Sequence, residues 1–168
     1  AGESTRFNSV TPKVLHKIFG KTIIERVIEI VDDGFDKKIV VVGHKSELVK
    51  KSISDKNVVF VEQIRQLGSG DAVKQTESIL KNFTGDLVIL SGVVPLLKKE
   101  PVSKLLSVHK KEKAAATVLT CEMENPSHYG RIVRNADGTV KAIVESKDAS
   151  DEIKKTKETL RSYSYQWQ

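Results

Sequence analysis

The apolar positions of this chain change period at regular intervals. Residues 22–31 carry isoleucine and valine at helical spacing, which predicts a helix with one buried side. Residues 38–42 form a nearly continuous β-branched run that ends at Gly43, a pattern typical of a buried parallel strand. Further strands are predicted at residues 58–61, 87–90 and 114–121, and further helices at residues 72–80 and 102–109. Strands separated by helices favour a doubly wound α/β fold with a mostly parallel sheet.

A short helix is predicted after the strand at residues 38–42. Ser46 is of a type that caps helix N-termini. Leu48, Val49 and Ile53 would form the inner side of this helix.

The alternation of predicted strands and helices ends near residue 130. Residues 130–133 and 139–144 flank the segment Asn135-Ala136-Asp137-Gly138, which predicts a β-hairpin and a small antiparallel edge. Residues 151–158 are charged and predict a helix or a loop. The tail at residues 162–168 alternates aromatic and polar types, so we expect an edge strand there.

Ligands of such sheets bind at the carboxyl ends of the strands, so the loops there are the candidate sites. Gly2 lies in a turn that brings backbone N–H groups toward phosphates, and Arg6 and Lys13 supply positive charge for a triphosphate. The alternative is an ordinary terminal segment with two solvated cations. In a second loop, the carboxamides of Gln63 and Gln66 can both donate to and accept from a base edge. The alternative there is a plain strand-to-helix connection.

Six short motifs follow one another in a fixed order. They are Ala-Gly-x-x-Thr-Arg with Pro-Lys-Val-Leu-His, then Val-Val-Gly-His, Glu-Gln-x-x-Gln-Leu-Gly-x-Gly, Gly-x-Val-Pro-Leu, Tyr-Gly-Arg-Ile-Val and Val-Glu-x-Lys-Asp-Ala. In this order the chain, from residue 1 to about 158, resembles bacterial UDP-N-acetylglucosamine pyrophosphorylase. It is similar to the N-terminal domain of the bifunctional enzyme, without the acetyltransferase part.

The resemblance implies a Rossmann-like nucleotidyltransferase that joins UTP and N-acetylglucosamine-1-phosphate with Mg²⁺ and releases pyrophosphate. It implies a ligand that is a nucleotide or nucleotide sugar. Family roles carried over to this chain make Arg6 and Lys13 catalytic by neutralising phosphate charge. They assign the nucleotide to Gly2, Gln63, Gln66, Gly68 and Ser69, and the sugar to Gly130 and Glu145.

Two positions depart from the family pattern where the resemblance implies metal ligands. Val93 stands where the family has an aspartate, and Leu160 stands where it has an asparagine. Mg²⁺ requires hard oxygen ligands, which neither hydrocarbon side chain offers. We therefore expect the Mg²⁺-dependent step to be impaired.

Other departures lie in the loops that face the ligand. Asp71 stands where a histidine is usual, and a carboxylate near an anionic ligand should weaken its binding. Ser69 replaces threonine, Ile64 is apolar in a usually polar loop, and Ser4 replaces a glycine. Two interpretations follow: an impaired uridylyltransferase, or a non-catalytic or redesigned ligand-binding protein on the same scaffold with an engineered or altered site.

The length and the net charge of the chain narrow the class of protein. A length of 168 residues fits one nucleotidyltransferase-like domain over residues 1–168, in which the first strand of the family is missing. A missing strand would leave a sheet edge that favours a homo-oligomer. The formal charge of +6 comes from scattered lysine doublets rather than an arginine-rich block, so no nucleic-acid partner is expected.

The length of the apolar runs and the single cysteine bear on the expected cellular location. The apolar runs are too short to cross a bilayer and no leader is recognisable, so no membrane partner is expected. The lone Cys121 suits a reducing compartment, and the cytoplasm is the expected location. Cys121 is expected to be a small buried hydrophobe.

The histidines leave one further hypothesis, a hydrolytic triad drawn from Ser69, Ser91, Asp71 and a histidine. Spacing alone cannot establish a triad, because triads are defined by geometry. His44 could face the pocket, whereas His16 and His109 are expected on helix surfaces.

Overall fold

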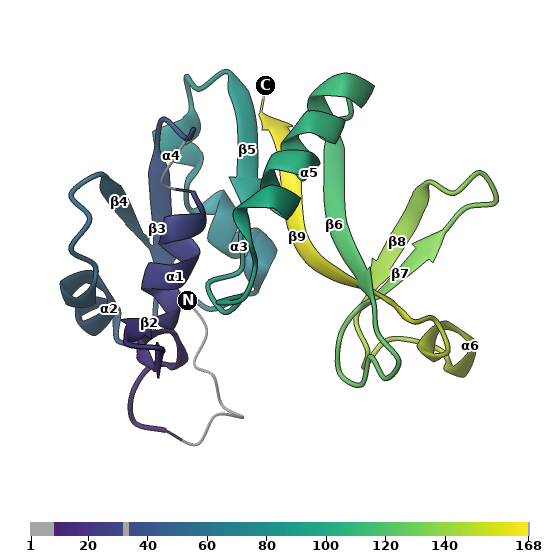
Figure 1. Ribbon diagram of the computed structural model, residues 1–168, viewed down its shortest axis with the longest axis horizontal. Coiled ribbons are helices and arrows are strands. Elements are labelled where there is room, and N and C mark those ends of the chain that lie inside the picture. The colour runs from purple at the N-terminus through teal and green to yellow at the C-terminus, as the bar shows by residue number, and fades with distance from the viewer. Residues whose placement is uncertain (1–8, 32–33, 168) are drawn as a thin grey trace. The chain divides into compact units, whose positions relative to one another are not determined.

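The computed structural model describes residues 9–31 and 34–167, with side chains described up to residue 160. The chain divides into two compact units. Of the described residues, unit 1 comprises 9–31, 34–85, 92–102 and 167, and unit 2 comprises 86–91 and 103–166. The strands and helices of both are drawn in Figure 1. The single domain expected from the sequence stays a prediction.

Unit 1 begins with short elements and continues as alternating strands and helices. In chain order these are η1 (Lys13–Leu15), β1 (Lys17–Ile18), β2 (Lys21–Thr22), α1 (Ile23–Ile30), β3 (Lys38–Val42), α2 (Ser46–Ser52), β4 (Val58–Glu62), α3 (Ser69–Lys74) and α4 (Glu77–Leu80). β1 and β2 form an antiparallel hairpin, and β3 pairs in parallel with β4 from Lys38↔Val58 to Val42↔Glu62. The predicted helix at residues 22–31 and the predicted strands at 38–42 and 58–61 are confirmed.

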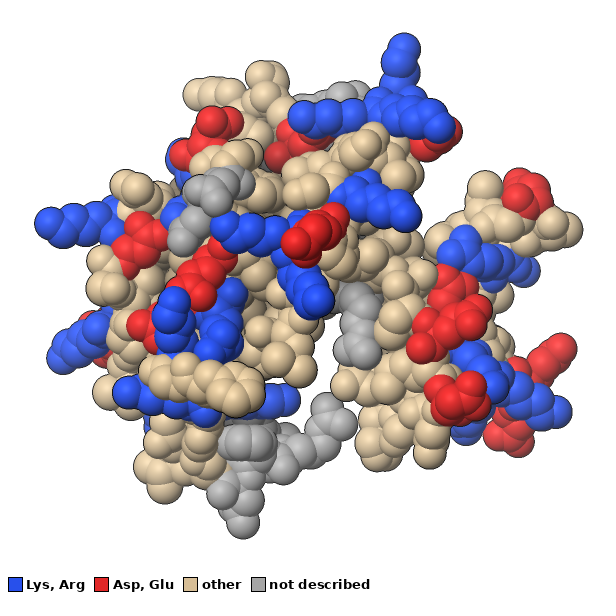
Figure 2. Space-filling model, viewed as in Figure 1, with Lys and Arg blue, Asp and Glu red and all other residues tan. Residues whose placement is uncertain are grey.

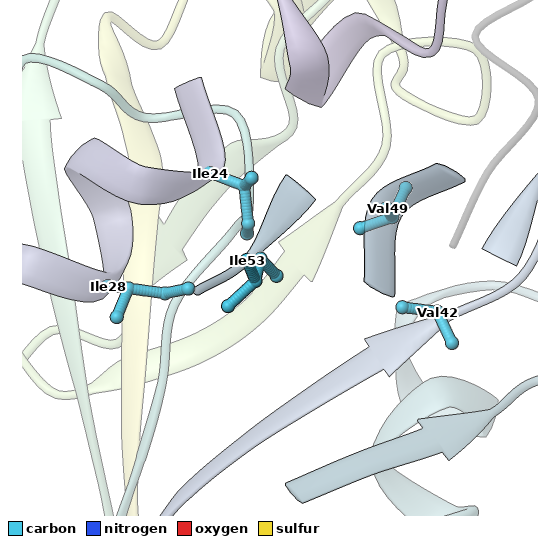
Figure 3. Packing of buried hydrophobic residues seen from close by; sticks show 5 residues of the cluster. All are labelled: Ile24, Ile28, Val42, Val49 and Ile53. Carbon is cyan, nitrogen blue, oxygen red and sulfur yellow. The ribbon is translucent and has the colours of Figure 1, made fainter. Parts of the chain in front are cut away.

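The core of unit 1 lies between α1, α2 and β3. Its buried members are Ile24, Ile28, Val42, Val49 and Ile53, shown in Figure 3. Each aliphatic side chain buried in this way contributes about 1.5–3 kcal/mol relative to leaving it in water. This packing fixes the strand ends from which the candidate loops leave.

The prediction for the helix after β3 was partly wrong. Lys45, in a left-handed conformation, precedes α2, and Ser46 makes no capping bond; its hydroxyl donates to Glu62 Oε1 at 2.8 Å. Val49 and Ile53 are buried as predicted, but Leu48 is 51% exposed. Positions four residues apart share a helix face, which turns Leu48 away from the core.

The helix predicted at residues 72–80 is broken into α3 and α4. At the break, Thr76 Oγ1 donates to the Val73 carbonyl oxygen at 2.7 Å. A threonine side chain that bonds to the backbone in this way competes with the helical hydrogen-bond ladder. The interruption therefore has a local cause that apolar spacing does not reveal.

Unit 2 is built on a five-stranded sheet. Its elements are β5 (Gly85–Ile89), α5 (Lys99–Glu112), β6 (Ala116–Glu122), β7 (Arg131–Arg134), β8 (Val140–Val144), α6 (Asp151–Lys154) and β9 (Glu158–Trp167), with the first residues of β5 and α5 belonging to unit 1. The order is β5-β9-β7-β8, and β6 pairs with β9.

The antiparallel part of this sheet is larger than the predicted hairpin. The hairpin itself is confirmed, with Arg131↔Val144 as its first pair and Asn135 N donating to Thr139 O at 2.9 Å in the turn. The tail forms a strand as predicted, but it is not an edge strand: β9 pairs with β6 on one side and lies between β5 and β7 in the sheet order. Among the described residues, no helix is long and apolar enough to cross a bilayer.

We expect the N-terminal cap of α1 to contribute measurably to stability. The Thr22 hydroxyl accepts from Glu25 N at 3.3 Å, and Glu25 Oε2 accepts from Thr22 N at 2.7 Å, so each residue satisfies the other's backbone. Thr22→Ala should lower the free energy of unfolding by about 1 kcal/mol, measured by urea denaturation. The matched control Thr11→Ala, at an exposed position, should change it by less than about 0.5 kcal/mol. Equal effects of the two changes would contradict the capping role.

The same cap predicts a pH dependence. The pKa of Glu25 is lowered, first because the Thr22 hydroxyl donates to its carboxylate and then because the Thr22 backbone N–H does. A lowered pKa in the folded state adds stability above the ordinary value of 4.5, and that stability is lost as the pH falls through the folded value. The difference in free energy of unfolding between the original chain and Glu25→Gln should therefore shrink as the pH is lowered through the folded-state pKa of Glu25. A difference that stays constant with pH would exclude this linkage.

Candidate functional site

The first candidate loop is described only at its end. Gly2, Ser4 and Arg6 lie outside the described residues. Lys13 opens the 3-10 helix η1, where Leu15 N donates to Pro12 O at 2.9 Å. The phosphate roles of Arg6 and Lys13 stay predictions.

The second candidate loop leaves the end of β4 and is held tightly to unit 1. Gln63 is 3% exposed, and its backbone N–H donates to Val42 O at 2.8 Å, extending the β3–β4 pairing by one residue. Its side-chain Nε2 donates to Gly68 O at 3.0 Å and to Asp71 Oδ2 at 2.7 Å. Gly68 has a φ of 110°, a conformation that favours glycine. The loop therefore closes on itself around one buried carboxamide.

The remaining side chains of this loop lie at the surface. Gln66 is exposed and its Nε2 reaches the Gln63 carbonyl oxygen at 3.5 Å, while Ser69 is the exposed first residue of α3. Ile64 and Leu67 are 86% and 71% exposed, so both apolar side chains face solvent. Of the two predicted base-binding glutamines, one is thus an internal anchor and the other is accessible.

Asp71 lies in the first turn of α3 and is engaged on both carboxylate oxygens. Oδ2 accepts from Gln63, and Oδ1 accepts from Gln75 Nε2 at 3.2 Å. None of these partners is a histidine, so the hypothesis of a triad through Asp71 gains no support. The expected weakening of anion binding by Asp71 stays a prediction.

The two positions expected to hold a metal do not fit one. Val93 lies in the turn after β5 and is 39% exposed, and Leu160 lies in β9, paired with Thr120. Both are hydrocarbon side chains, so neither provides an oxygen ligand for Mg²⁺. Within residues 9–31 and 34–160, no group of three or more His, Cys, Asp or Glu side chains could hold a metal ion.

Unit 2 brings the two predicted sugar-binding residues together. A Cβ built on Gly130 would lie 3.4 Å from the Val144 carbonyl oxygen and 3.9 Å from Glu145 Cα. Glu145 is exposed, and its carbonyl oxygen accepts from Asp148 N at 2.9 Å in a tight turn. Gly130 has no side chain, and the exposed carboxylate of Glu145 belongs to a residue that lies near it in space. Sugar hydroxyls could approach the backbone at the glycine and donate to the carboxylate.

Arg131 is a residue of this region to which the sequence analysis gave no role. It is 3% exposed, and its guanidinium donates to three backbone carbonyl oxygens, those of Ser127 (3.3 Å), Tyr129 and Lys154 (3.4 Å). Ser146 Oγ donates to the same Ser127 oxygen at 3.0 Å. Arg131 therefore ties the turn before Gly130 to the end of α6, and Ser146 ties the same turn to the segment after Glu145. The available signal was an arginine directly before the apolar pair Ile132-Val133 in this strand.

His109 was wrongly expected on a helix surface. It is 2% exposed, its Nδ1 lies 2.8 Å from Thr117 Oγ1, and its Nε2 lies 3.8 Å from Asp86 Oδ1. The last distance exceeds a hydrogen bond. A hollow of about 350 Å³ beside it is lined by Asp86, His109, Lys110 and Lys113. Lys110 Nζ lies 3.5 Å from Asp86 Oδ2, so these two charges offset each other.

Cys121 is half-buried rather than fully buried, with its Sγ 3.4 Å from Thr159 Oγ1. Beside it, Arg134 donates two hydrogen bonds to Glu158, at 2.8 and 2.6 Å. Figure 2 shows basic and acidic side chains interspersed on the visible face.

The fold is that of nucleotide-sugar pyrophosphorylases. The apo structure of a UDP-glucose pyrophosphorylase superposes with a TM-score of 0.77 at 17% identity, covering 99% of this chain and 74% of that one. A CMP:2-keto-3-deoxy-manno-octonic acid synthetase complexed with CTP gives a TM-score of 0.65 at 18% identity, with coverages of 92% and 67%. These likenesses confirm the predicted Rossmann-like α/β class.

Sequence relatives agree with the fold. The bifunctional protein GlmU of Nostoc sp. strain PCC 7120 is 42% identical over 151 residues, which is 89% of this chain and 34% of the relative. GlmU of Streptococcus mutans is 45% identical over 159 residues, with coverages of 94% and 34%. The chain thus spans about a third of the length of these curated relatives. They confirm the predicted resemblance to the uridylyltransferase part of the bifunctional protein. Because residues 1–157 also match the family described as the MobA-like NTP transferase domain, the chain belongs to that family.

Proposed function

We propose that this domain binds a uridine nucleotide and that its reaction is uridylyl transfer from UTP to N-acetylglucosamine-1-phosphate, in a form impaired at Val93 and Leu160. The observation that carries the proposal is the loop from Gln63 to Asp71 at the end of a parallel strand, where a buried carboxamide is held in one orientation. Preorganised polar groups of this kind suit the edge of a base better than a flexible surface loop does.

The reaction requires no general base from the protein. An oxygen of the sugar phosphate attacks the α-phosphorus of UTP, that P–O bond forms, and the bond to the leaving pyrophosphate breaks. In this proposal Lys13 and Arg6 offset the negative charge, and the loop containing Gln66, Gly68 and Ser69 holds the uridine. Gly130 and Glu145 contact the sugar. No step is assigned to a metal, because the side chains at the two expected ligand positions do not fit one.

A non-catalytic binding protein is the alternative function. Val93 and Leu160 favour it, because a nucleotidyltransferase without oxygen ligands at these positions would bind its substrates and turn them over slowly. Both functions share the nucleotide site, so binding of UTP is expected in either case. Turnover is what separates them.

Restoring the oxygen ligands should raise activity. The double variant Val93→Asp, Leu160→Asn is expected to release pyrophosphate from UTP and N-acetylglucosamine-1-phosphate with Mg²⁺ at least about a hundredfold faster than the original chain. The matched control Val93→Ile, Leu160→Val should stay as slow as the original. Metal-dependent turnover by the original chain at the rate of the variant would refute the impairment. A folded variant that stays inactive would favour the binding protein.

Removing the Arg131 guanidinium should loosen the proposed sugar loops. Arg131→Met leaves the carbonyl oxygens of Ser127, Tyr129 and Lys154 without this donor, a cost of about 1–3 kcal/mol for buried polar groups. Hydrogen exchange at the amide of Tyr129 should accelerate at least about tenfold, and N-acetylglucosamine-1-phosphate should bind more weakly. The matched control is Arg65→Met, at an exposed position of unit 1. Unchanged exchange in Arg131→Met would exclude the positioning role.

A further inference from the structure

His109 carries a ring nitrogen that is buried and open to a ligand. The side chain is 2% exposed, and its Nδ1 lies 2.8 Å from Thr117 Oγ1, so that nitrogen is paired. Its Nε2 lies 3.8 Å from Asp86 Oδ1, beyond hydrogen-bond range, and no other described residue bonds to it. Buried polar atoms without a partner are rare in folded proteins. Nε2 is therefore available to a group from outside the chain.

This open nitrogen faces the hollow of about 350 Å³ in unit 2. The hollow is lined by Asp86 in β5, by His109 and Lys110 in the last turn of α5, and by Lys113 just beyond that helix, and all four residues belong to unit 2. Asp86 both lines the hollow and faces Nε2, whereas the Nδ1 edge of the ring faces Thr117 on β6. The unpaired edge of the imidazole is thus directed into the hollow, whose volume suits a small ligand.

The charges around the hollow favour an anion. Lys110 Nζ lies 3.5 Å from Asp86 Oδ2, so these two charges offset each other. Lys113 makes no ion pair with any described residue and adds a positive charge. A divalent cation would meet two ammonium groups, and only Asp86 and His109 could ligate it. An anion would instead meet two ammonium groups and an imidazole nitrogen, which are partners for charge-assisted hydrogen bonds.

The end of α5 opposes an anion less than a bare helix terminus would. Carbonyl oxygens at a helix C-terminus carry partial negative charge. Here the His109 carbonyl oxygen accepts from Ala114 N at 3.2 Å, and that of Lys110 accepts from Lys113 N at 3.3 Å. Lys113 makes this closure with a φ of 47°, a conformation that glycine adopts at lower cost. Two of the carbonyl oxygens that would repel an anion are therefore engaged.

We propose that this hollow is an accessory site for a phosphate group, which is held by Lys110 and Lys113 and hydrogen-bonded to His109 Nε2. A phosphate group has oxygen atoms for both ammonium groups. Its protonated form can also donate, so it matches Nε2 in either tautomer of the imidazole, whereas a carboxylate only accepts. The phosphate is either free or the terminal group of a small ester. The site shares no residue with the proposed function and does not rest on it.

The test is titration of the full chain with inorganic phosphate and, separately, with glycerol phosphate, in EDTA and at constant ionic strength. The nitrogen NMR signals of the His109 ring report on this site alone, so phosphate bound elsewhere does not interfere. These signals should shift saturably, with a dissociation constant of about 1 mM, whereas chloride should not shift them. A shift with both ligands assigns the site to the terminal phosphate of an ester. A shift with inorganic phosphate alone assigns it to the free ion.

Three variants separate binding from folding. Lys113→Gly removes one ammonium group at a left-handed position that suits glycine, so it should weaken phosphate binding at least about fivefold without lowering the free energy of unfolding. Asp86→Asn removes the carboxylate and releases Lys110, so binding should strengthen at least about threefold. Lys111→Ala is the matched control, because it loses the same charge from the last turn of α5 but does not line the hollow. It should change the affinity by less than about twofold.

Several outcomes would overturn the accessory site. One is a His109 signal that neither phosphate compound shifts, or that chloride shifts equally. Another is an unchanged affinity in folded Lys113→Gly. Weaker binding by folded Asp86→Asn would contradict the assignment of an anion, because a site for a cation loses a ligand in that variant. Titration with UTP decides the proposed function separately, and its failure would leave this site intact.

Discussion

The parallel pairing of β3 with β4, packed against α1 and α2, is the constraint on which the loop from Gln63 to Asp71 depends. The apolar side chains of β3 and its two helices must be removed from water, and this holds the carboxyl end of β3 at one place. The hydrogen bond from Gln63 N to Val42 O then carries the pairing one residue past β4. A loop that starts from such a fixed point can hold a side chain in a single orientation.

Buried polar groups organise the rest of the candidate site in both units. Gln63 in unit 1 and Arg131 in unit 2 are each 3% exposed, and each directs its N–H groups at backbone carbonyl oxygens of its own loop. Polar groups are rarely buried without partners, because the lost hydration is not otherwise replaced. The loops closed in this way are those to which the proposed function assigns the nucleotide and the sugar.

The departures from the family pattern are of two physical kinds. At Val93 and Leu160, hydrocarbon side chains stand where the resemblance implies oxygen ligands, so the expected impairment concerns the metal-dependent step. At Asp71, a carboxylate stands where the resemblance implies a histidine, and its two oxygens accept from Gln63 and Gln75.

The sequence by itself determined the elements whose causes are local. Apolar positions at helical spacing predicted α1, the β-branched run predicted β3, and Asn135 to Gly138 predicted the hairpin turn. The order of short motifs identified the family. These signals depend on residues near one another in the chain, so no knowledge of distant contacts was needed.

Tertiary structure decided which side chains are buried and what they face. The sequence could not show that His109 is buried beside Thr117, that Ser46 binds Glu62 instead of capping its helix, or that the tail strand lies inside a sheet. Gln63 was predicted to be a base-binding residue, but the direction of its amide follows from Gly68 and Asp71, which only the folded loop brings within 3.0 Å. Hydrogen-bond polarity and burial depend on partners that are distant in sequence or separated by a turn, and spacing along the chain does not encode them.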